Sequence, residues 1–332
     1  MREVKTVLCP MDLSAISDRE VELASQICLR FGARLVLQHN LDRVPPIYLA
    51  NVWMYSETHM YPEEEQQAKA ERRFQEIFSK LPKTIPVEGK ITQGHLEDTI
   101  LKLAYQLPAD LIVMGTHDRR GSEHISHTDR VLLQSPCPIL TLREAESQKV
   151  TPRLAGPAEQ PVLVPMDFSP HSLRTLEYAL SLLETLPINL HLLHVVRPMS
   201  WGDIPGLTHL NVTDRRRRHV EENQVRLESL IPANLTSRVR AEVAVGSTVQ
   251  EIIGCANRVQ ATMIIMGVHP KGTIDKWLFG ATSCGVLHHS NCPVWIVPPM
   301  KSMHDSSWTK VKAATASHAA NSSEHGPEYY SG

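Results

Sequence analysis

An internal duplication constrains the fold of this chain more than any other feature. Residues 7–14 read VLCPMDLS, and residues 162–169 read VLVPMDFS. The offset between the copies is 155 residues at both ends of the repeat and 152 residues in its middle, where Met114-Gly115 matches Met266-Gly267. Because this register holds along most of both segments, we interpret the chain as two tandem copies of one domain.

Changes in composition divide the 332 residues into four parts. Residues 144–160 are polar, contain Pro and Gly and show no apolar periodicity, so a linker is expected there. Residues 300–332 are rich in Ser, Ala and His and are expected to be a disordered tail. The two expected domains therefore span residues 1–143 and 161–299, and each is long enough for one core.

Short apolar runs alternate with helical patterns in each copy. The expected strands of the second copy are residues 161–165, 190–196, 239–245, 263–266 and 294–297. Ser169-Pro170 is typical of a helix start, with a hydroxyl at the N-cap and proline at the first helical position. This alternation predicts an α/β fold, with a five-stranded parallel sheet flanked by helices in each copy. Ligands of such sheets bind beyond the carboxyl ends of the strands, where the strand order reverses.

Charge, hydropathy and cysteine usage exclude several classes of partner. Lys and Arg number 34 against 36 Asp and Glu, which argues against nucleic acid or an anionic membrane as a partner. No apolar run is long enough for a membrane span, and the N-terminal residues enter a strand-like segment with no room for a signal peptide. The six cysteines include no C-x-x-C pair and most lie in apolar segments, as expected of reduced thiols in a cytoplasmic protein.

Motifs of catalysis and metal binding are missing from the sequence. It contains no G-x-x-x-x-G-K-(S/T), G-x-G-x-x-G, H-E-x-x-H or G-x-S-x-G pattern, so no catalytic residue is predicted and the chain is not expected to be an enzyme. His117, His124 and His127 are interpreted as polar loop residues, and no metal site is predicted. The arginine run at residues 215–218 is flanked by acidic residues and is interpreted as a solvated helix face.

Four short motifs together resemble the universal stress protein family. Each copy opens with Pro-x-Asp-x-Ser, at Pro10 and Pro165, and enters its last expected strand with Cys-Pro. In the second copy Gly267 ends the fourth strand, and Gly280 follows at the family's spacing before the next helix. The resemblance covers nearly all of residues 3–298 and implies two Rossmann-like domains of the adenine nucleotide alpha hydrolase type.

The resemblance implies an ATP site in the second copy. Asp167 would lie on the adenosine side with Val195 beside the adenine, and the Gly280 region would hold the phosphates. Pro270 replaces a glycine of the family's pattern and removes an N–H donor, and Ala281 replaces its hydroxyl residue. The implied cofactor-binding residues are Asp167, Val195, Met266, Gly267, Pro270, Gly280, Ala281 and Thr282.

The first copy departs further from the family's pattern. Asp12 and Gly115 persist, but Asp118 stands where the second glycine belongs. A three-residue deletion then brings Ile125 or Ser126 to the place of the third glycine. A carboxylate repels phosphate at short range, so the first copy is expected to bind nucleotide poorly or not at all.

Three functions remain open from the sequence. The leading hypothesis is a cytoplasmic stress-response or regulatory module that binds ATP in its second copy and transmits the bound state to an unknown protein partner. The second is a nucleotide-free interaction scaffold with both sites degenerate. The third, an enzyme of the same fold, has no candidate residues. The family also implies an intramolecular pseudo-dimer, pairing residues 138–142 with 293–297, and two chains could associate further as a homodimer.

Overall fold

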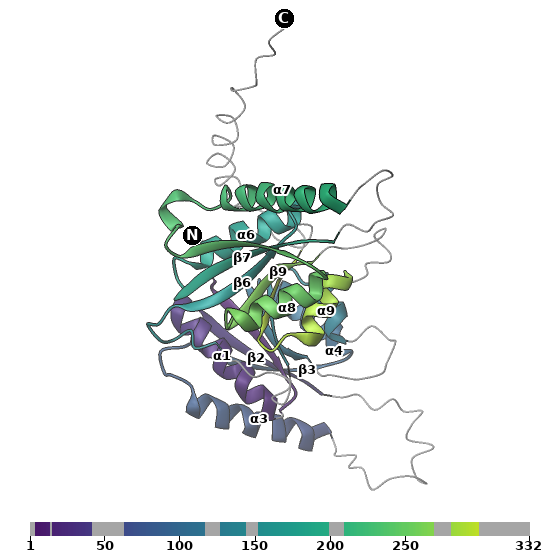
Figure 1. Ribbon diagram of the computed structural model, residues 1–332. Helices are drawn as coiled ribbons and strands as arrows, with labels where there is room; N and C mark the ends of the chain where they lie inside the picture. The colour runs from purple at the N-terminus through teal and green to yellow at the C-terminus, as the bar shows by residue number, and fades with distance from the viewer. Residues whose placement is uncertain are drawn as a thin grey trace, which may run out of the picture.

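The computed structural model describes residues 4–13, 15–41, 63–116, 127–143, 152–198, 209–268 and 280–298 (Figure 1). Both copies alternate strands and helices in the same order. The first copy contains β1 (Thr6–Met11), α1 (Ala15–Phe31), β2 (Arg34–Leu41), α3 (Glu63–Lys80), β3 (Val87–Gln93), α4 (Leu96–Gln106), β4 (Leu111–Thr116), α5 (His127–Gln134) and β5 (Ile139–Arg143). The second contains β6 (Gln160–Met166), α6 (Pro170–Leu182), β7 (Ile188–Val196), α7 (His209–Glu228), the 3-10 helix η2 (Ala233–Leu235), β8 (Val239–Val245), α8 (Thr248–Arg258), β9 (Met263–Gly267), α9 (Ala281–His289) and β10 (Val294–Val297).

The strands of both copies join in one sheet of ten strands, in the order β3-β2-β1-β4-β5-β10-β9-β6-β7-β8. Within each copy the five strands are parallel, as the sequence predicts. β5 and β10 pair antiparallel at the centre, with Leu140 opposite Trp295. The predicted pairing of the two closing segments is therefore confirmed, and the duplication forms one continuous sheet.

Helices cover both faces of this sheet because side chains of successive strand residues point to opposite faces. On one face α1, α3, α6 and α7 cover a core that includes Val7, Cys9 and Leu227. On the other face α4, α5, α8 and α9 cover a second core that includes Leu8 and Ile112. Each core contains residues of both copies, so the two domains share their hydrophobic interior. In Figure 1, α7 and α3 lie at opposite ends of the molecule.

The seam between the copies is packed by large side chains. Trp295 is fully buried, and its ring centroid lies 6.0 Å from that of Tyr178. Thr141 Oγ1 donates to the carbonyl oxygen of Val294 at 3.0 Å across the antiparallel pair. The second copy of the Ser-x-Cys-Pro motif repeats the first, since the Ser135 and Ser290 hydroxyls each donate to a carbonyl two residues later at 2.7 Å.

Part of the predicted linker is integrated into the fold. Leu154 is fully buried in the core beneath α1, although the sequence shows no periodicity there. Gln26 Oε1 accepts from the Leu154 N–H at 2.7 Å, and Arg30 Nε donates to the Leu154 carbonyl at 2.6 Å. Hydrogen bonds from helix α1 therefore hold the segment between the copies against the core. Composition alone predicts that this segment is an exposed linker.

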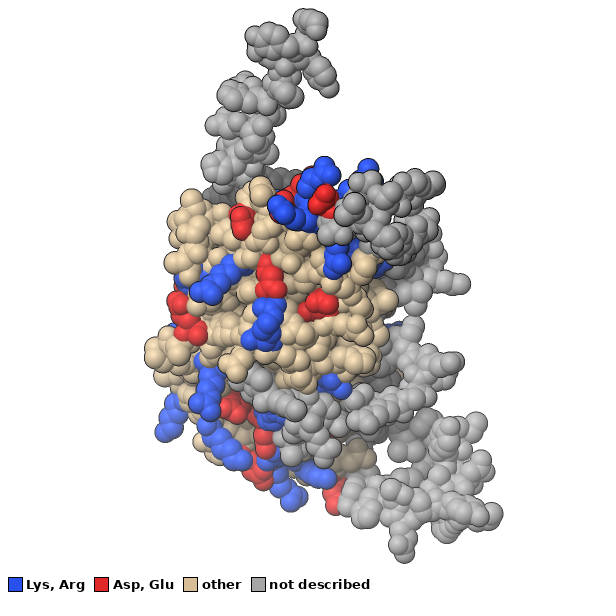
Figure 2. All heavy atoms as spheres, in the orientation of Figure 1, with Lys and Arg blue, Asp and Glu red and all other residues tan. Residues whose placement is uncertain are grey.

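Acidic and basic side chains are both present on the face of the molecule that Figure 2 shows. Basic side chains lie among acidic ones there, along α7 at the top and α3 at the bottom. The arginines at positions 215–218 are exposed on α7, and Arg217 Nε pairs with Glu221 at 2.9 Å. All six cysteines are free, and only Cys284 is not buried. No helix among the residues described is both long and apolar enough to cross a bilayer.

Candidate functional site

The strand order reverses twice in the sheet, once in each copy. In the second copy β6 lies between β7 and β9, and the chain crosses to opposite faces after β6 and after β9. We call each place where the strand order reverses a switch point. A crevice forms there at the carboxyl ends of the strands, and ligands bind in it in folds of this class. The ends of β6, β7 and β9 carry Asp167, Val195 and Gly267, so the sequence places three of its candidate residues at one edge of the sheet.

The turn between β6 and α6 is fixed by its own hydrogen bonds. Asp167 Oδ1 accepts from the Ser169 N–H at 3.0 Å, and the Ser169 hydroxyl caps α6 by accepting from the Ser172 N–H at 3.1 Å. Phe168 between them has φ 59°, in the left-handed region that a side chain of this size rarely adopts. Leu13 has φ 64° at the same place in the first copy. Both copies therefore hold a strained turn after their first strand, a feature common at ligand sites.

A close approach of two elements explains the glycine at the end of β9. A methyl group at Gly267 would lie 2.6 Å from Thr175 Oγ1, inside contact distance. The Thr175 hydroxyl donates to the His171 carbonyl within α6 at 3.0 Å. The Ser283 hydroxyl of α9 donates to the Gly267 carbonyl at 3.4 Å. Helices α6 and α9 thus both contact β9 at Gly267, and each brings one hydroxyl group to this strand end. We call Thr175, Ser283 and Gly267 the floor of the second switch point.

Helix α9 begins at the same edge of the sheet. Gly280 is its N-cap, with φ −61° and ψ 139°, and no side chain caps the helix. Ala281 and Thr282 form the first turn, whose backbone N–H groups have no partner within the helix. Ala281 is exposed, so the N–H groups of this turn lie near solvent. Free N–H groups and the positive end of the helix dipole suit an anion such as phosphate.

Aromatic and cationic side chains lie beside the β6–α6 turn. The rings of Phe168 and His194 are 4.5 Å apart, and His194 Nδ1 lies 2.8 Å from the Met166 carbonyl oxygen. The Arg226 guanidinium of α7 lies 4.1 Å above the Phe168 ring. His39 repeats the histidine contact in the first copy, at 3.0 Å from the Met11 carbonyl oxygen. Both copies therefore have a histidine that contacts the end of the first strand, and aligning the two copies of the sequence identifies it.

Seven of the eight predicted residues lie at the carboxyl edge of the second copy's strands or at the start of α9. Asp167 is exposed, Val195 is half-buried and Met266 is buried at 5% exposure. Pro270 lies outside the described residues. Thr175 and Ser283 were not predicted, although both line the switch point. No sequence signal singles out Thr175, which stands opposite Glu20 at the 155-residue offset.

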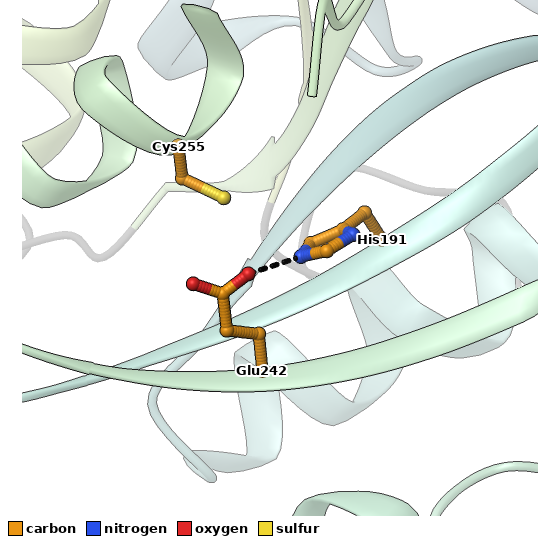
Figure 3. Close-up of side chains that lie close together, drawn as sticks. All are labelled: His191, Glu242 and Cys255. Carbon is orange, nitrogen blue, oxygen red and sulfur yellow. Dashed lines mark hydrogen bonds and ion pairs between the residues drawn. The ribbon is translucent and has the colours of Figure 1, made fainter. Parts of the chain in front are cut away.

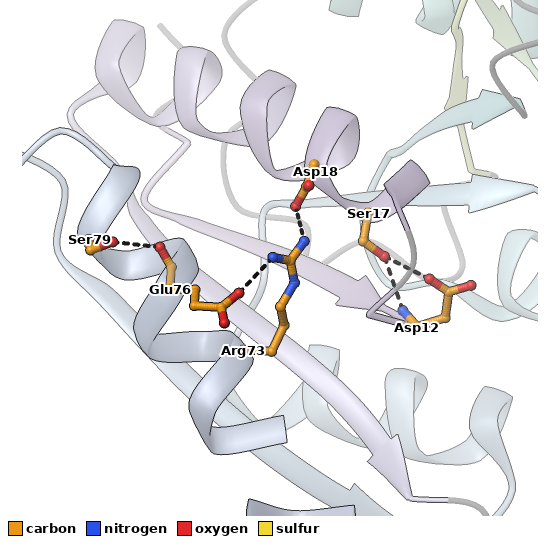
Figure 4. Close-up of polar contacts among 6 residues, drawn as sticks. All are labelled: Asp12, Ser17, Asp18, Arg73, Glu76 and Ser79. Carbon is orange, nitrogen blue, oxygen red and sulfur yellow. Dashed lines mark hydrogen bonds and ion pairs between the residues drawn. The ribbon is translucent and has the colours of Figure 1, made fainter. Parts of the chain in front are cut away.

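The first copy carries a different group at this place. The Glu20 side chain is 4% exposed, and burial together with the charge of Asp12 raises the pKa of its carboxyl to about 8. The Ser17 hydroxyl donates to Asp12 Oδ1 at 2.8 Å, so α1 holds this carboxylate against its own first turn (Figure 4). Two carboxyl groups therefore lie beside the first switch point, where the second has one carboxyl group and the Thr175 hydroxyl.

The end of β2 is occupied by an internal hydrogen-bond network. Asn40, at the position of Val195, donates through Nδ2 to the Gly94 carbonyl at 2.9 Å. Its Oδ1 accepts from the hydroxyls of Thr92 and Thr99 at 3.0 and 3.1 Å. Arg73 of α3 bridges Asp18 and Glu76 nearby, at 2.6 and 2.9 Å (Figure 4). Polar groups at the first switch point therefore satisfy one another within the protein.

A family model named Usp, the universal stress protein family, matches residues 3–143 and 159–298. The chain belongs to the universal stress protein family. It contains two Usp domains in tandem, so the predicted family and the predicted tandem α/β fold are confirmed. Universal stress proteins are usually non-catalytic, and some members bind ATP.

Individual relatives match one domain or the whole tandem. A universal stress protein of Thermus aquaticus is 30% identical over 142 residues, which are 42% of this chain and 98% of that protein. The universal stress protein A homolog 1 of Coxiella burnetii is 24% identical over 141 residues, 42% of this chain and 95% of its own. A solved universal stress protein from Archaeoglobus fulgidus DSM 4304 covers 90% of this chain and 99% of its own, with a TM-score of 0.59 and 21% identity. A solved protein of unknown function from Pseudomonas aeruginosa PAO1 covers 90% and 94%, with a TM-score of 0.56 and 13% identity.

Proposed function

We propose that the second Usp domain binds an adenine nucleotide and that the first does not. The nucleotide would lie across the carboxyl ends of β6, β7 and β9, with the adenosine at Asp167 and Val195. The phosphates would lie at Gly267 and at the first turn of α9. The chain would act as a non-catalytic, stress-responsive module whose bound state is read by a partner protein, and its six free thiols fit a reducing compartment such as the cytoplasm.

The difference between the two switch points carries this proposal. In the second domain the floor is made of Thr175, Ser283 and Gly267, which bring hydroxyl groups and no added charge to the strand ends. In the first domain the buried Glu20 lies beside Asp12, and both are carboxyl groups. A triphosphate carries several negative charges, so it would be repelled by Asp12 and, above about pH 8, also by Glu20, whereas the described part of the second domain adds no carboxyl group beside Asp167.

The uncapped start of α9 supports the same assignment. Gly280 lets the backbone approach a ligand closely, and no side chain among the described residues caps the N–H groups of the first turn. These groups compensate in part for Pro270, which contributes no N–H. We therefore expect ATP to bind more weakly than it would to a loop that keeps the glycine and hydroxyl of the family's pattern.

Titration calorimetry of ATP into the full chain tests the proposal with a matched pair of variants. Asp167→Ala is expected to weaken binding at least tenfold, whereas Asp12→Ala, the equivalent change in the first domain, is expected to leave the affinity unchanged. Circular dichroism spectra and melting curves establish that both variants are folded. Affinity no tighter than millimolar in the unaltered chain would refute nucleotide binding and favour the nucleotide-free scaffold. Equal weakening by both variants would refute the assignment to the second domain.

A further inference from the structure

Three ligand-type side chains converge on the sheet of the second domain, away from the proposed nucleotide site. His191 comes from β7, Glu242 from β8 and Cys255 from α8 (Figure 3). One donor atom of each lies within 4.8 Å of the others. Figure 3 shows the sulfur of Cys255 directed toward the gap between the imidazole and the carboxylate. Nitrogen, oxygen and sulfur donors of this kind are the ligands that Zn²⁺ takes in proteins.

The cluster combines an imidazole, a carboxylate and a thiol. His191 Nε2 and Glu242 Oε2 are 2.8 Å apart, and Arg258 holds the other carboxylate oxygen, Oε1, at 2.5 Å. Burial raises the pKa of Glu242, but the hydrogen bonds from Arg258 and His191 outweigh it and lower the pKa overall. Glu242 is therefore a carboxylate at neutral pH, and its Oε2 faces the same gap as the other two donors.

The equivalent positions of the first domain show that the fold does not require this cluster. At offsets of 155 and 152 residues they hold Val36, Lys90 and Leu103. Val36 and Leu103 are buried in the apolar core of that face. Burying polar groups is unfavourable unless they are paired, so His191 and Cys255, at two positions that hold buried apolar residues in the first domain, call for a separate reason.

We propose that His191, Glu242 and Cys255 bind a thiophilic divalent metal ion, with Zn²⁺ as the best match, and leave a fourth position to water. Tetrahedral Zn²⁺ with bonds of about 2.0–2.3 Å sets its ligand atoms roughly 3.3–3.8 Å apart. The imidazole nitrogen and the carboxylate oxygen are 2.8 Å apart and must separate slightly, while all three donor atoms lie within 4.8 Å of one another, so small side-chain movements would complete the geometry. On binding, the thiol releases its proton to solvent as the metal–sulfur bond forms, and the proton that His191 Nε2 donates to Glu242 moves to Nδ1 or to solvent, so that Nε2 can bind the metal.

Access and the surrounding charges fit this assignment. The Glu242 side chain is 30% exposed, which gives an ion and a bound water a route from solvent. Arg258 can remain on Oε1 while Oε2 binds the metal, and a partner on the outer oxygen orients a ligating carboxylate. The positive charge of Arg258 also repels the metal ion, so the affinity of the cluster for Zn²⁺ is expected to be lower than that of a closed structural zinc site.

A catalytic role for the cysteine fits the geometry less well. Cys255 is 3% exposed, and burial, with the nearby charge of Glu242 among smaller effects, raises the pKa of its thiol to about 11. His191 Nε2 bonds to the carboxylate, so this nitrogen is not positioned to take the thiol's proton. A nucleophilic cysteine needs a lowered pKa and access to substrate, and the cluster provides neither.

Cobalt absorption of the full chain tests the proposal directly. Titration of metal-free protein with Co²⁺ is expected to give a thiolate-to-cobalt charge-transfer band that saturates at one equivalent and disappears when Zn²⁺ is added. Cys255→Ser should abolish the band and His191→Gln should weaken cobalt binding at least tenfold. Cys284→Ser, a change of the one cysteine that is not buried, is the matched control and should leave the band intact. Absence of the band, or its survival in Cys255→Ser, would overturn the proposal.

Thermal melting separates a metal site from an ion-pair network. A ligand that binds only the folded state raises its melting temperature with concentration. Zn²⁺ is therefore expected to raise the melting temperature of the unaltered chain and of Cys284→Ser, and to raise it much less for His191→Gln. If His191→Gln lowers the melting temperature without metal and Zn²⁺ raises none of the three, the cluster is structural only and the proposal fails. Nucleotide binding plays no part in either measurement.

Discussion

Glu20→Gln is expected to stabilise the protein at alkaline pH and to change its stability little at acidic pH. The Glu20 side chain is 4% exposed on the inner face of α1. Burial, with a further contribution from Asp12, raises the pKa of this carboxyl from 4.5 to about 8. Because the folded state favours the protonated form, the stabilisation from this group is complete below pH 4.5 and is lost as the pH rises through 8.

The size of the effect follows from the width of that interval. One pKa unit corresponds to about 1.4 kcal/mol, so the unaltered chain should lose about 1.4 kcal/mol per pH unit through this one group. Across the whole interval the loss is on the order of 5 kcal/mol, comparable with the net stability of many domains. The amide of the variant is neutral at every pH and has nearly the shape of the protonated acid, so its stability should lack this slope.

Urea unfolding at several pH values between 5 and 9, followed by circular dichroism, measures the difference. The free energy of unfolding of Glu20→Gln minus that of the unaltered chain should grow with pH up to about 8 and level off above it. Glu22→Gln is the matched control, since Glu22 lies on the same helix with its side chain exposed. Its curve should run parallel to that of the unaltered chain. A Glu20→Gln curve that also runs parallel would refute the reasoning and show that Glu20 is ionised in the folded protein.

Three further predictions concern the seam, the turn and the floor of the second domain. Trp295→Ala should lower the free energy of unfolding by about 3–5 kcal/mol, because the indole is fully buried where the copies meet. Ser169→Ala should cost about 1 kcal/mol through loss of the α6 cap, whereas Ser181→Ala, a change of a half-buried serine within α6, should cost less. Gly267→Ala should destabilise the protein because its methyl group meets Thr175 Oγ1, and Thr175→Ala should restore most of that loss in the double variant.

Each of these predictions is checked by denaturant unfolding. A loss below 1 kcal/mol for Trp295→Ala would mean that the seam is not a packed core. Equal costs for the two serine variants would contradict the role of the cap. Purely additive effects of the changes at Gly267 and Thr175 would show that the close approach does not limit this position.

The fold was largely predictable because the strands, the helix starts and the duplication each leave a recognisable pattern in the sequence. Apolar runs mark the strands, and Ser169-Pro170 marks the start of α6, where the structure places the cap. The repeat register relates the two halves, and the pairing of the closing strands follows from the family resemblance. Leu154 was not predictable, because a single apolar residue in a polar segment has no period, and its burial depends on Gln26 and Arg30 more than 120 residues earlier.

The sites were less predictable, since they depend on contacts between elements. Sequence motifs identify the strand ends and Gly280, but Thr175 is recognised only when α6 is seen against Gly267. The residues His191, Glu242 and Cys255 follow no motif spacing, so the sequence, which predicts no metal site, could not single out this cluster. Its members are 51 and 13 residues apart and become neighbours through the pairing of β7 with β8 and the packing of α8.

The shared core explains how the first domain can hold a buried carboxyl group at its switch point and remain folded. The last strand of each copy is covered within the chain, because β5 and β10 are paired and Trp295 is buried between the copies. This apolar contact is present whether or not a ligand binds. It can offset the few kcal/mol that a buried Glu20 beside Asp12 costs at neutral and alkaline pH. Duplication therefore allows the first switch point to differ from the second without loss of the fold.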